Sequence, residues 1–244
     1  MEAVLENLDA GTLVPAASLR NAWVKFGQFT AIQDISLEIE AGAFYSILGP
    51  SGCGKSTLLR LVSDLIPPAS GDVSIFGKTT EAARLAREFA FVFQDATLLP
   101  WRTALENVQL PLEMGQSRGI QIPVSDKSPM ELLELVGLKG REHALPHELS
   151  GGMRQRVAIA RALVCKPKLL LMDEPFGALD EMTRDHLNLQ LLKVWEETGV
   201  TILFVTHSIP EAVFLGQKVL MLKAHPGRLH KIVDIDLPYP RTTE

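Results

Sequence analysis

The segment Gly49 to Ser56, GPSGCGKS, has the residue types and spacing of a phosphate-binding loop, G-x-x-x-x-G-K-[ST]. Glycines let such a loop wrap closely enough for its N–H groups to point at phosphate oxygens, and the helix that follows adds its positive dipole end. Lys55 would meet the β and γ phosphates of a nucleotide, and the Ser56 hydroxyl would bind Mg²⁺. Cys53 occupies a free position and is given no chemistry of its own. We expect nucleotide contacts from Gly49, Pro50, Ser51, Gly52, Cys53, Gly54, Lys55, Ser56 and Thr57.

Two acidic residues, Asp173 and Glu174, follow the apolar run LLLM. At the carboxyl end of a parallel strand, Asp173 can reach the Mg²⁺ shell and Glu174 can orient and polarise a water at the γ phosphate. Such a pair alone is more often a turn or a helix start, but the phosphate loop reverses that preference. His207 follows the run TILFVT, where an imidazole could hydrogen-bond the γ phosphate or the water, although a lone histidine there is more often structural. The predicted catalytic residues are therefore Glu174, His207 and Lys55.

A second anion-binding element is predicted in LSGGMRQR, residues 149–156. This segment opens the helical pattern GMRQRVAIARALV, so that Ser150 and the backbone of Gly151 and Gly152 form a helix N-terminus. One bound nucleotide cannot use both this element and the loop at Lys55. The chain therefore carries two phosphate-binding elements that require an explanation.

Alternating and continuous apolar runs predict the elements that position these residues. Ile35, Leu37 and Ile39 alternate with polar residues, as in a half-buried strand of an N-terminal β region. The apolar run 43–48 leads into the phosphate loop, and residues 55–62 have helical spacing. Strands are further predicted at 72–76, 89–93, 169–173, 201–205 and 218–222, with a terminal strand in the alternating segment after residue 227. Since helical patterns separate several of them, a mostly parallel α/β core is expected.

Helix starts and a helical insertion complete this prediction. Ser128 and Ser208 each precede a glutamate by three residues, with a proline early in the turn, as at capped helix N-termini. Between Asp95 and Cys165 the pattern is mainly helical, which predicts a separate α lobe inserted in the core.

Composition limits the classes of function. The 244 residues are 46% hydrophobic, enough for one domain or a core with lobes, and the net charge of −5 without a basic run argues against a nucleic-acid partner. The N-terminus is acidic where a secretory signal would be positive, and no apolar run approaches the roughly 18 residues of a spanning helix. We therefore expect no export and a membrane role only through a partner. Cys53 and Cys165 are expected to be free thiols of a reducing compartment.

On the phosphate loop, the acid pair and LSGGMRQR, the sequence resembles the ATP-binding cassette (ABC) family, whose signature is LSGGQ, from about residue 17 to 225. In that family two cassettes pair head to tail, and the signature of one closes on the ATP held by the other. The resemblance implies an α/β fold: a P-loop NTPase core with a mostly parallel sheet, an N-terminal antiparallel β subdomain and an inserted α-helical subdomain. It further implies one domain over 17–244, a helical lobe over about 96–165 and an N-terminal extension over 1–16.

The resemblance also implies roles for further residues. Phe26 is similar to the aromatic that stacks on adenine, and Gln94 to the glutamine that meets Mg²⁺ and senses the membrane subunit. Residues 178–180 are similar to the loop across the dimer interface, while Glu174 and His207 match the catalytic glutamate and the switch histidine. The nucleotide contacts thus extend to Phe26, Gln94, Ser150, Gly151, Gly152 and Asp180. The metal ligands are expected to be Ser56, Gln94 and Asp173. Two departures, Met153 for the signature glutamine and Phe26 for the commoner tyrosine, leave phosphate binding and stacking intact.

Within the family, residues 95–113 and the tail from His225 resemble the importer group that handles nitrate, sulfonates, taurine and similar solutes. This implies an ATP-hydrolysing subunit that uses ATP and Mg²⁺ and is peripheral to the cytoplasmic face of the inner membrane. Its expected partners are a second ATP-binding subunit as a homodimer, transmembrane permease subunits and, indirectly, a solute-binding protein. An exporter ATPase and a soluble ABC ATPase outside transport remain alternatives, and the lack of fused membrane helices favours the importer.

Overall fold

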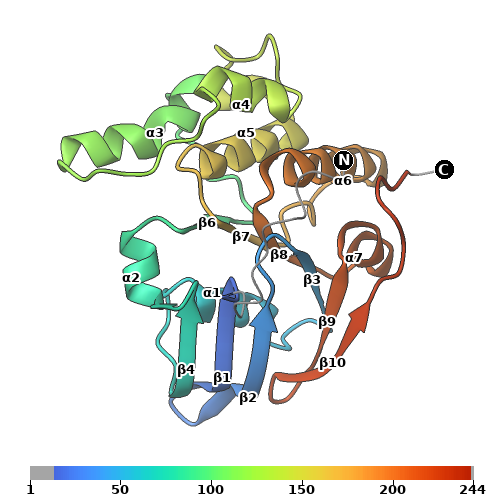
Figure 1. The fold of residues 1–244 in the computed structure, drawn as a ribbon. Coiled ribbons are helices and arrows are strands. Elements are labelled where there is room, and N and C mark those ends of the chain that lie inside the picture. The colour runs from blue at the N-terminus through green and yellow to red at the C-terminus, as the bar shows by residue number, and fades with distance from the viewer. Residues whose placement is uncertain (1–13, 243–244) are drawn as a thin grey trace, which may run out of the picture.

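Two β-sheets form the framework in the computed structural model, which describes residues 14–242 (Figure 1). The smaller sheet is antiparallel, in the order β2-β1-β4-β5. Its strands are β1 (Ala17–Phe26), β2 (Phe29–Ile39), β4 (Ser70–Ile75) and β5 (Lys78–Thr79). Along β2, Ile35, Leu37 and Ile39 are buried and the residues between them exposed, which confirms the predicted half-buried strand. Of the predicted 1–16 extension, residues 1–13 lie outside the described residues.

The larger sheet has the order β10-β9-β3-β8-β7-β6 and carries the catalytic candidates. Its strands are β3 (Phe44–Leu48), β6 (Phe89–Val92), β7 (Leu169–Asp173), β8 (Thr201–Thr206), β9 (Lys218–Lys223) and β10 (Arg228–Asp234). The strands are parallel except for β10, which runs antiparallel to β9, so the mostly parallel core is confirmed. The predicted strand at 72–76 does not belong to this core and pairs with β1 instead, as part of β4. The first three residues of β4 are exposed, whereas a strand of a covered parallel sheet is buried on both faces.

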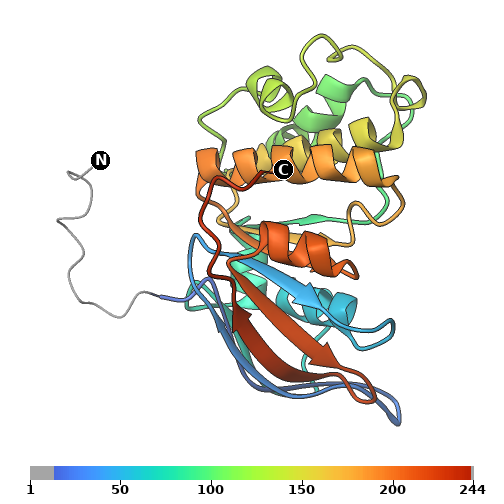
Figure 2. The same cartoon turned by 90° about the vertical axis from the view of Figure 1, so that its right-hand side faces the viewer.

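Helices cover the larger sheet and form a lobe above it. Helices α1 (Lys55–Val62), α2 (Thr80–Leu85), α6 (Glu181–Thr198) and α7 (Ile209–Leu215) belong to the two-sheet body. The lobe contains α3 (Ala104–Ser117), α4 (Pro129–Leu135), a 3₁₀ turn (Pro146–Glu148) and α5 (Gly151–Leu163). Figure 2 shows α6, in orange, running between this lobe and the sheet. The predicted caps are confirmed, because Ser128 and Ser208 each accept a hydrogen bond from the backbone N–H of the glutamate three residues later.

Two hydrophobic clusters hold these layers together. One lies between the larger sheet and the lobe and includes Phe44, Phe176 and Phe204, with neighbouring ring centroids about 6 Å apart. The other lies between the two sheets and α1 and includes Tyr45 and Ile47. Residues on the two faces of β3 thus pack into opposite clusters, which explains why the strand is apolar except for the buried Ser46. Both cysteines are buried free thiols, and among residues 14–242 no helix has the length and apolarity needed to cross a membrane.

Candidate active site

The loop between β3 and α1 is wound tightly enough to present its backbone to an anion. Gly52 and Gly54 have φ angles of 75° and 95°, in the left-handed region that favours glycine. A Cβ atom at Gly49 would lie 2.7 Å from the Cys53 sulfur, so only glycine fits there. No side chain caps α1, so its first N–H groups are available to a ligand. Cys53 is buried within the loop and burial raises the pKa of its thiol, which leaves only its backbone as a contact.

Lys55 opens α1 and turns its ammonium back over the loop. Its Nζ donates hydrogen bonds to the carbonyl oxygens of Gly49 and Pro50, at 2.9 and 3.3 Å. The same nitrogen lies 3.7 Å from Oε1 of Glu174. Because the ammonium is 6% exposed, these oxygens compensate its lost hydration. The lysine is therefore held where a phosphate in the loop would meet it.

Ser56 and Asp173 lie together where β3 and β7 end. The Ser56 hydroxyl donates a hydrogen bond of 2.7 Å to Oδ1 of Asp173. Burial raises the pKa of Asp173, while the bond from Ser56 and the charge of Arg60 act in the opposite direction. A hydroxyl and a partly buried carboxylate are oxygen ligands of the kind that Mg²⁺ prefers. The residues present therefore fit a magnesium ion.

Glu174 is the central acid of the site. Its backbone φ of 46° is unusual for a residue other than glycine, and such strain tends to be retained at functional positions. Its two carboxylate oxygens face Lys55 on one side and His207 on the other, with 3.6 Å between Oε2 and Nδ1 of the histidine. His207 lies in the turn after β8, with about half of its side chain exposed. A carboxylate held in this way can accept a proton from a water molecule.

A cavity of about 260 Å³ joins these groups to the hairpin between β1 and β2. It is lined by loop and helix residues from Ser51 to Thr57, by Glu174, and by Phe26 and Phe29. The two phenylalanines face each other across the strand pair and are 53% and 59% exposed, so their rings are free to stack on a base. The sequence predicts stacking on the base for Phe26 alone, and the position of Phe29 beside it in the cavity was not predicted. An exposed aromatic three residues after Phe26, beyond the turn, was the available signal.

The second phosphate-binding element lies elsewhere. Ser150 caps α5 by accepting a 3.2 Å hydrogen bond from Met153 N–H, and Asp180 caps α6 in the same way. Gly151 borders a separate cavity of about 400 Å³, together with Gln94. Gly152 is packed against α6. The structure thus brings Lys55, Ser56, Asp173, Glu174 and His207 together and places Gln94, Ser150, Gly151, Gly152 and Asp180 outside the cavity at the phosphate loop.

Two residues of α5 that the sequence analysis missed hold the segment around Gln94. The Gln155 amide nitrogen donates to the carbonyl oxygens of Gln94 and Phe93. The Arg161 guanidinium donates to those of Ala96 and Thr97, at 2.7 and 2.9 Å. Arg161 is the one polar residue of VAIARALV and is the local signal of this contact, whereas Gln155 precedes that apolar run. Helix α5 is therefore hydrogen-bonded to the segment that carries Gln94.

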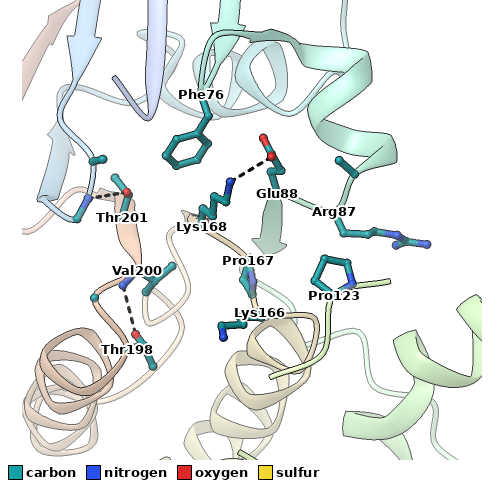
Figure 3. A pocket seen from close by; sticks show the side chains of 14 residues that line it. Phe76, Arg87, Glu88, Pro123, Lys166, Pro167, Lys168, Thr198, Val200 and Thr201 are labelled. Atoms are coloured by element: carbon teal, nitrogen blue, oxygen red, sulfur yellow. Dashed lines mark hydrogen bonds and ion pairs between the residues drawn. The ribbon is translucent and has the colours of Figure 1, made fainter. Parts of the chain in front are cut away.

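A larger cavity, of about 520 Å³, lies at the amino ends of β6, β7 and β8 (Figure 3). Glu88 accepts hydrogen bonds there from Lys168, at 3.3 Å, and from Lys78, at 2.6 Å. Ligands of parallel α/β sheets bind at the carboxyl ends of the strands, and the conjunction of loop, acids and histidine is at those ends. Chemistry, rather than size, therefore identifies the smaller cavity as the candidate active site.

Comparisons with known proteins identify the family of the chain. Residues 32–177 match the family described as "ABC transporter". The chain is 46% identical over 212 residues to an aliphatic sulfonates import ATP-binding protein of Bacillus subtilis, covering 87% of this chain and 80% of that protein. A similar protein of Bacillus licheniformis is 44% identical over 213 residues, with coverage of 87% and 80%.

Solved structures give the same result for the fold. A dimeric bacterial ABC transporter cassette is 37% identical with a TM-score of 0.74, covering 90% of this chain and 98% of the other. A dimeric ATP-binding cassette in a post-hydrolysis state, bound to ADP and Pi, is 35% identical with a TM-score of 0.72 and the same coverage.

Proposed function

The chain belongs to the ABC transporter family as an ATP-binding, ATP-hydrolysing subunit, and from this premise we propose that it powers import of a small solute through separate permease subunits. The solute class we propose is a nitrate-, sulfonate- or taurine-like small molecule. This rests on the two sulfonate-import relatives and on the sequence resemblance to that importer group. In this function the subunit is peripheral to the cytoplasmic face of the inner membrane, and a solute-binding protein delivers cargo to the permease.

The observation that carries the proposed chemistry is the Glu174 carboxylate between Lys55 and His207. Glu174 orients a water and accepts its proton as the water attacks the γ phosphate, while His207 holds the reacting groups in place. Lys55 and the loop N–H groups stabilise the negative charge of the phosphates. Ser56 and Asp173, which are hydrogen-bonded to each other, would hold Mg²⁺, with Gln94 as a further ligand from the neighbouring cavity; the ion would supply positive charge at the phosphates. Phe26 stacks on the adenine.

Dimerisation explains the second phosphate-binding element. The N-termini of α1 and α5 open on separate cavities, so one nucleotide in one chain cannot use both. We propose that two copies pair head to tail, so that Ser150, Gly151 and Gly152 of one chain close on ATP held by the other, with Asp180 at the interface. A two-fold pairing of this kind buries the same patch on both chains.

A groove between the lobe and the larger sheet supports the proposed permease contact. It has a volume of about 370 Å³ and is lined by Phe89 and Phe91 of β6 and by Leu110 and Met114 of α3. Arg161, which holds the segment after Gln94, reaches the same groove. An apolar groove rimmed by polar residues suits an amphipathic helix of a partner. Movement of the partner's helix would then be transmitted through Arg161 to the segment that carries Gln94.

Glu174→Gln tests the catalytic proposal. The amide keeps the size of the side chain but cannot accept the proton, so kcat should fall by roughly 10²-fold or more. ATP binding, measured by equilibrium dialysis, should be unchanged, and a nucleotide-bound dimer should accumulate on gel filtration. Hydrolysis at the wild-type rate would remove Glu174 from its role.

Reconstitution tests the transport proposal. ATPase activity is measured for the chain alone and with its permease subunits in liposomes, with and without each candidate solute and its binding protein. Stimulation by solute and binding protein is expected for an importer. A basal rate that neither permease nor solute alters would favour an ATPase outside transport.

A further inference from the structure

A buried carboxyl group, Glu211 of α7, lies four residues after His207 and takes no part in the chemistry described above. It is 6% exposed. The Thr206 hydroxyl donates a hydrogen bond to Oε2 of Glu211, and the backbone N–H of Ser208 donates to that hydroxyl oxygen at 3.0 Å. Thr206 and Ser208 are the residues on either side of His207. The backbone that carries the histidine is therefore tied on both sides to Glu211.

The opposite side of Glu211 faces α6. Asn188, which is 3% exposed, and Arg184 belong to this helix. Burial raises the pKa of Glu211, while the Thr206 hydroxyl, the charges of Arg184 and His207, and the Asn188 amide act in the opposite direction. Helices α6 and α7 pack against each other. Glu211 thus connects the turn after β8 with the middle of α6.

Arg184 continues the connection to the loop before α6. One of its terminal nitrogens, Nη2, donates a hydrogen bond of 3.0 Å to the carbonyl oxygen of Leu179. Leu179 belongs to the 178–180 segment, which is the proposed dimer-interface loop, and Asp180 caps the same helix. Arg184 therefore holds this loop by a hydrogen bond, and its charge acts on Glu211 although no ion pair joins the two among the described residues.

This polar cluster is costly for a purely structural feature. Oε1 of Glu211, Oδ1 of Asn188 and Nε of Arg184 are buried, and none of them has a hydrogen-bond partner among the described residues. A buried polar atom without a partner destabilises a fold, and apolar side chains of similar volume would avoid that cost. Unsatisfied atoms near the turn that carries His207 can instead gain hydrogen-bond partners when a neighbouring segment moves.

We propose that Glu211 is a positioning residue for ATP hydrolysis, which fixes the His207 turn through Thr206 and Ser208 and belongs to a helix packed against α6, the helix that begins at the 178–180 loop. The inference rests on the proposed roles of His207 and Glu174. It makes the placement of the histidine depend on a buried carboxyl group outside the phosphate-binding cavity.

Thr206→Val tests the first link, with Thr201→Val as a matched control. Both threonines are buried in β8, and each hydroxyl accepts one backbone N–H; Thr201 accepts from Gly42 at the far end of the strand. Both variants should lose thermal stability, Thr206→Val the more because its hydroxyl also donates to the buried Glu211. Only Thr206→Val should lower kcat, by about tenfold, with KM for ATP unchanged, because the phosphate loop is untouched. An equal fall in kcat for both variants would overturn the inference.

Glu211→Ala and Glu211→Gln test the carboxyl group itself, alone and combined with His207→Ala, by single-turnover hydrolysis of labelled ATP. Glu211→Ala should lower the rate about tenfold, and Glu211→Gln should restore most of it, because an amide can accept from Thr206 and donate to Asn188. In the His207→Ala background, Glu211→Ala should have no further effect, since it acts through the histidine.

The outcomes separate this inference from the proposed function. Equal losses for Glu211→Ala with and without His207 would mean a structural role and would overturn the inference. If Glu211→Ala hydrolyses ATP at the wild-type rate while His207→Ala is slow, the inference is overturned and the proposed function stands. Wild-type hydrolysis by His207→Ala itself would instead overturn the assigned role of the histidine. If Glu211→Ala does not fold, Thr206→Val combined with His207→Ala gives the same test.

Discussion

Single residues around the phosphate loop show local costs that the chemistry explains. Glu174 keeps a left-handed backbone conformation, which costs on the order of 1–3 kcal/mol for a residue other than glycine. Lys55 is buried with its charge compensated by two carbonyl oxygens and by Glu174. Phe26 leaves half of its ring in solvent. A nucleotide bound in the cavity would account for each of these features.

Phe26→Ala should weaken ATP binding, because stacking of an aromatic ring on a base contributes roughly 1–3 kcal/mol. We expect Kd for ATP to rise about tenfold and Phe26→Tyr to leave it within about twofold. Phe29→Ala is the matched control, since Phe29 lines the same cavity with a similar exposure. Isothermal titration calorimetry measures all three. A rise in Kd for Phe29→Ala equal to that for Phe26→Ala would contradict the assignment of Phe26.

At the scale of elements, local sequence patterns predicted what local interactions decide. The strand, loop and helix from 43 to 62 follow from a change of hydrophobic period and from glycine positions, and the helix start at Ser128 follows from a capping box within four residues. The strand at 72–76 was predicted, but its expected place in the parallel core was wrong. It pairs with β1 instead, and such pairing joins residues far apart in sequence. The contacts of Gln155 and Arg161 were missed for the same reason.

Arg161→Met should loosen the segment that carries Gln94 without unfolding α5. The variant keeps much of the side chain's volume and removes the hydrogen bonds to Ala96 and Thr97. Backbone amides of residues 94–98 should then exchange hydrogen about tenfold faster, as measured by mass spectrometry.

Arg156→Met is the control for this prediction, because Arg156 leaves the same helix toward Gly137. Its effect should be confined to the neighbourhood of Gly137. Faster exchange throughout α5 in the Arg161 variant would show that the arginine stabilises the helix rather than the segment.

Glu88 ties β5 to the start of β7 in a pH-dependent way. Burial raises its pKa, but hydrogen bonds from Lys78 and Lys168 outweigh burial and bring the pKa below the ordinary value of 4.5. The folded state therefore binds a proton less readily than the unfolded state. The contribution of Glu88 to stability is present above about pH 4.5 and is lost as the pH falls below that value.

Glu88→Gln should accordingly lower the free energy of unfolding at pH 7 by about 1 kcal/mol, since both lysines are half exposed and solvent screens the pairs. The difference from wild type should shrink in urea titrations between pH 5 and pH 3.5. Glu134→Gln is the control, because its pair with Lys139 is exposed on both sides. A difference that stays constant with pH would show that charge is not its source.

On the scale of the whole molecule, the two predicted phosphate-binding elements would determine the proposed assembly. The loop at Lys55 and the helix start at Gly151 border different cavities. The groove beside α3 shares lining residues with neither cavity. A head-to-tail dimer would join each loop to the signature of the other chain and leave both grooves for permease subunits. Hydrolysis would then require residues from two chains.

Mixing two inactive variants tests this requirement. Lys55→Ala removes the loop lysine and leaves the signature intact, whereas Gly151→Asp places a negative charge at the signature. An aspartate suits the first turn of α5, and its Cβ would lie 3.0 Å from the flexible end of Leu179, so the variant should fold. In an equal mixture half of the dimers are mixed, each with one intact loop and signature pair, so about a quarter of the wild-type ATPase activity should return. If mixed dimers form, as shown by cross-linking of tagged chains, and no activity returns, the two elements do not act across the interface.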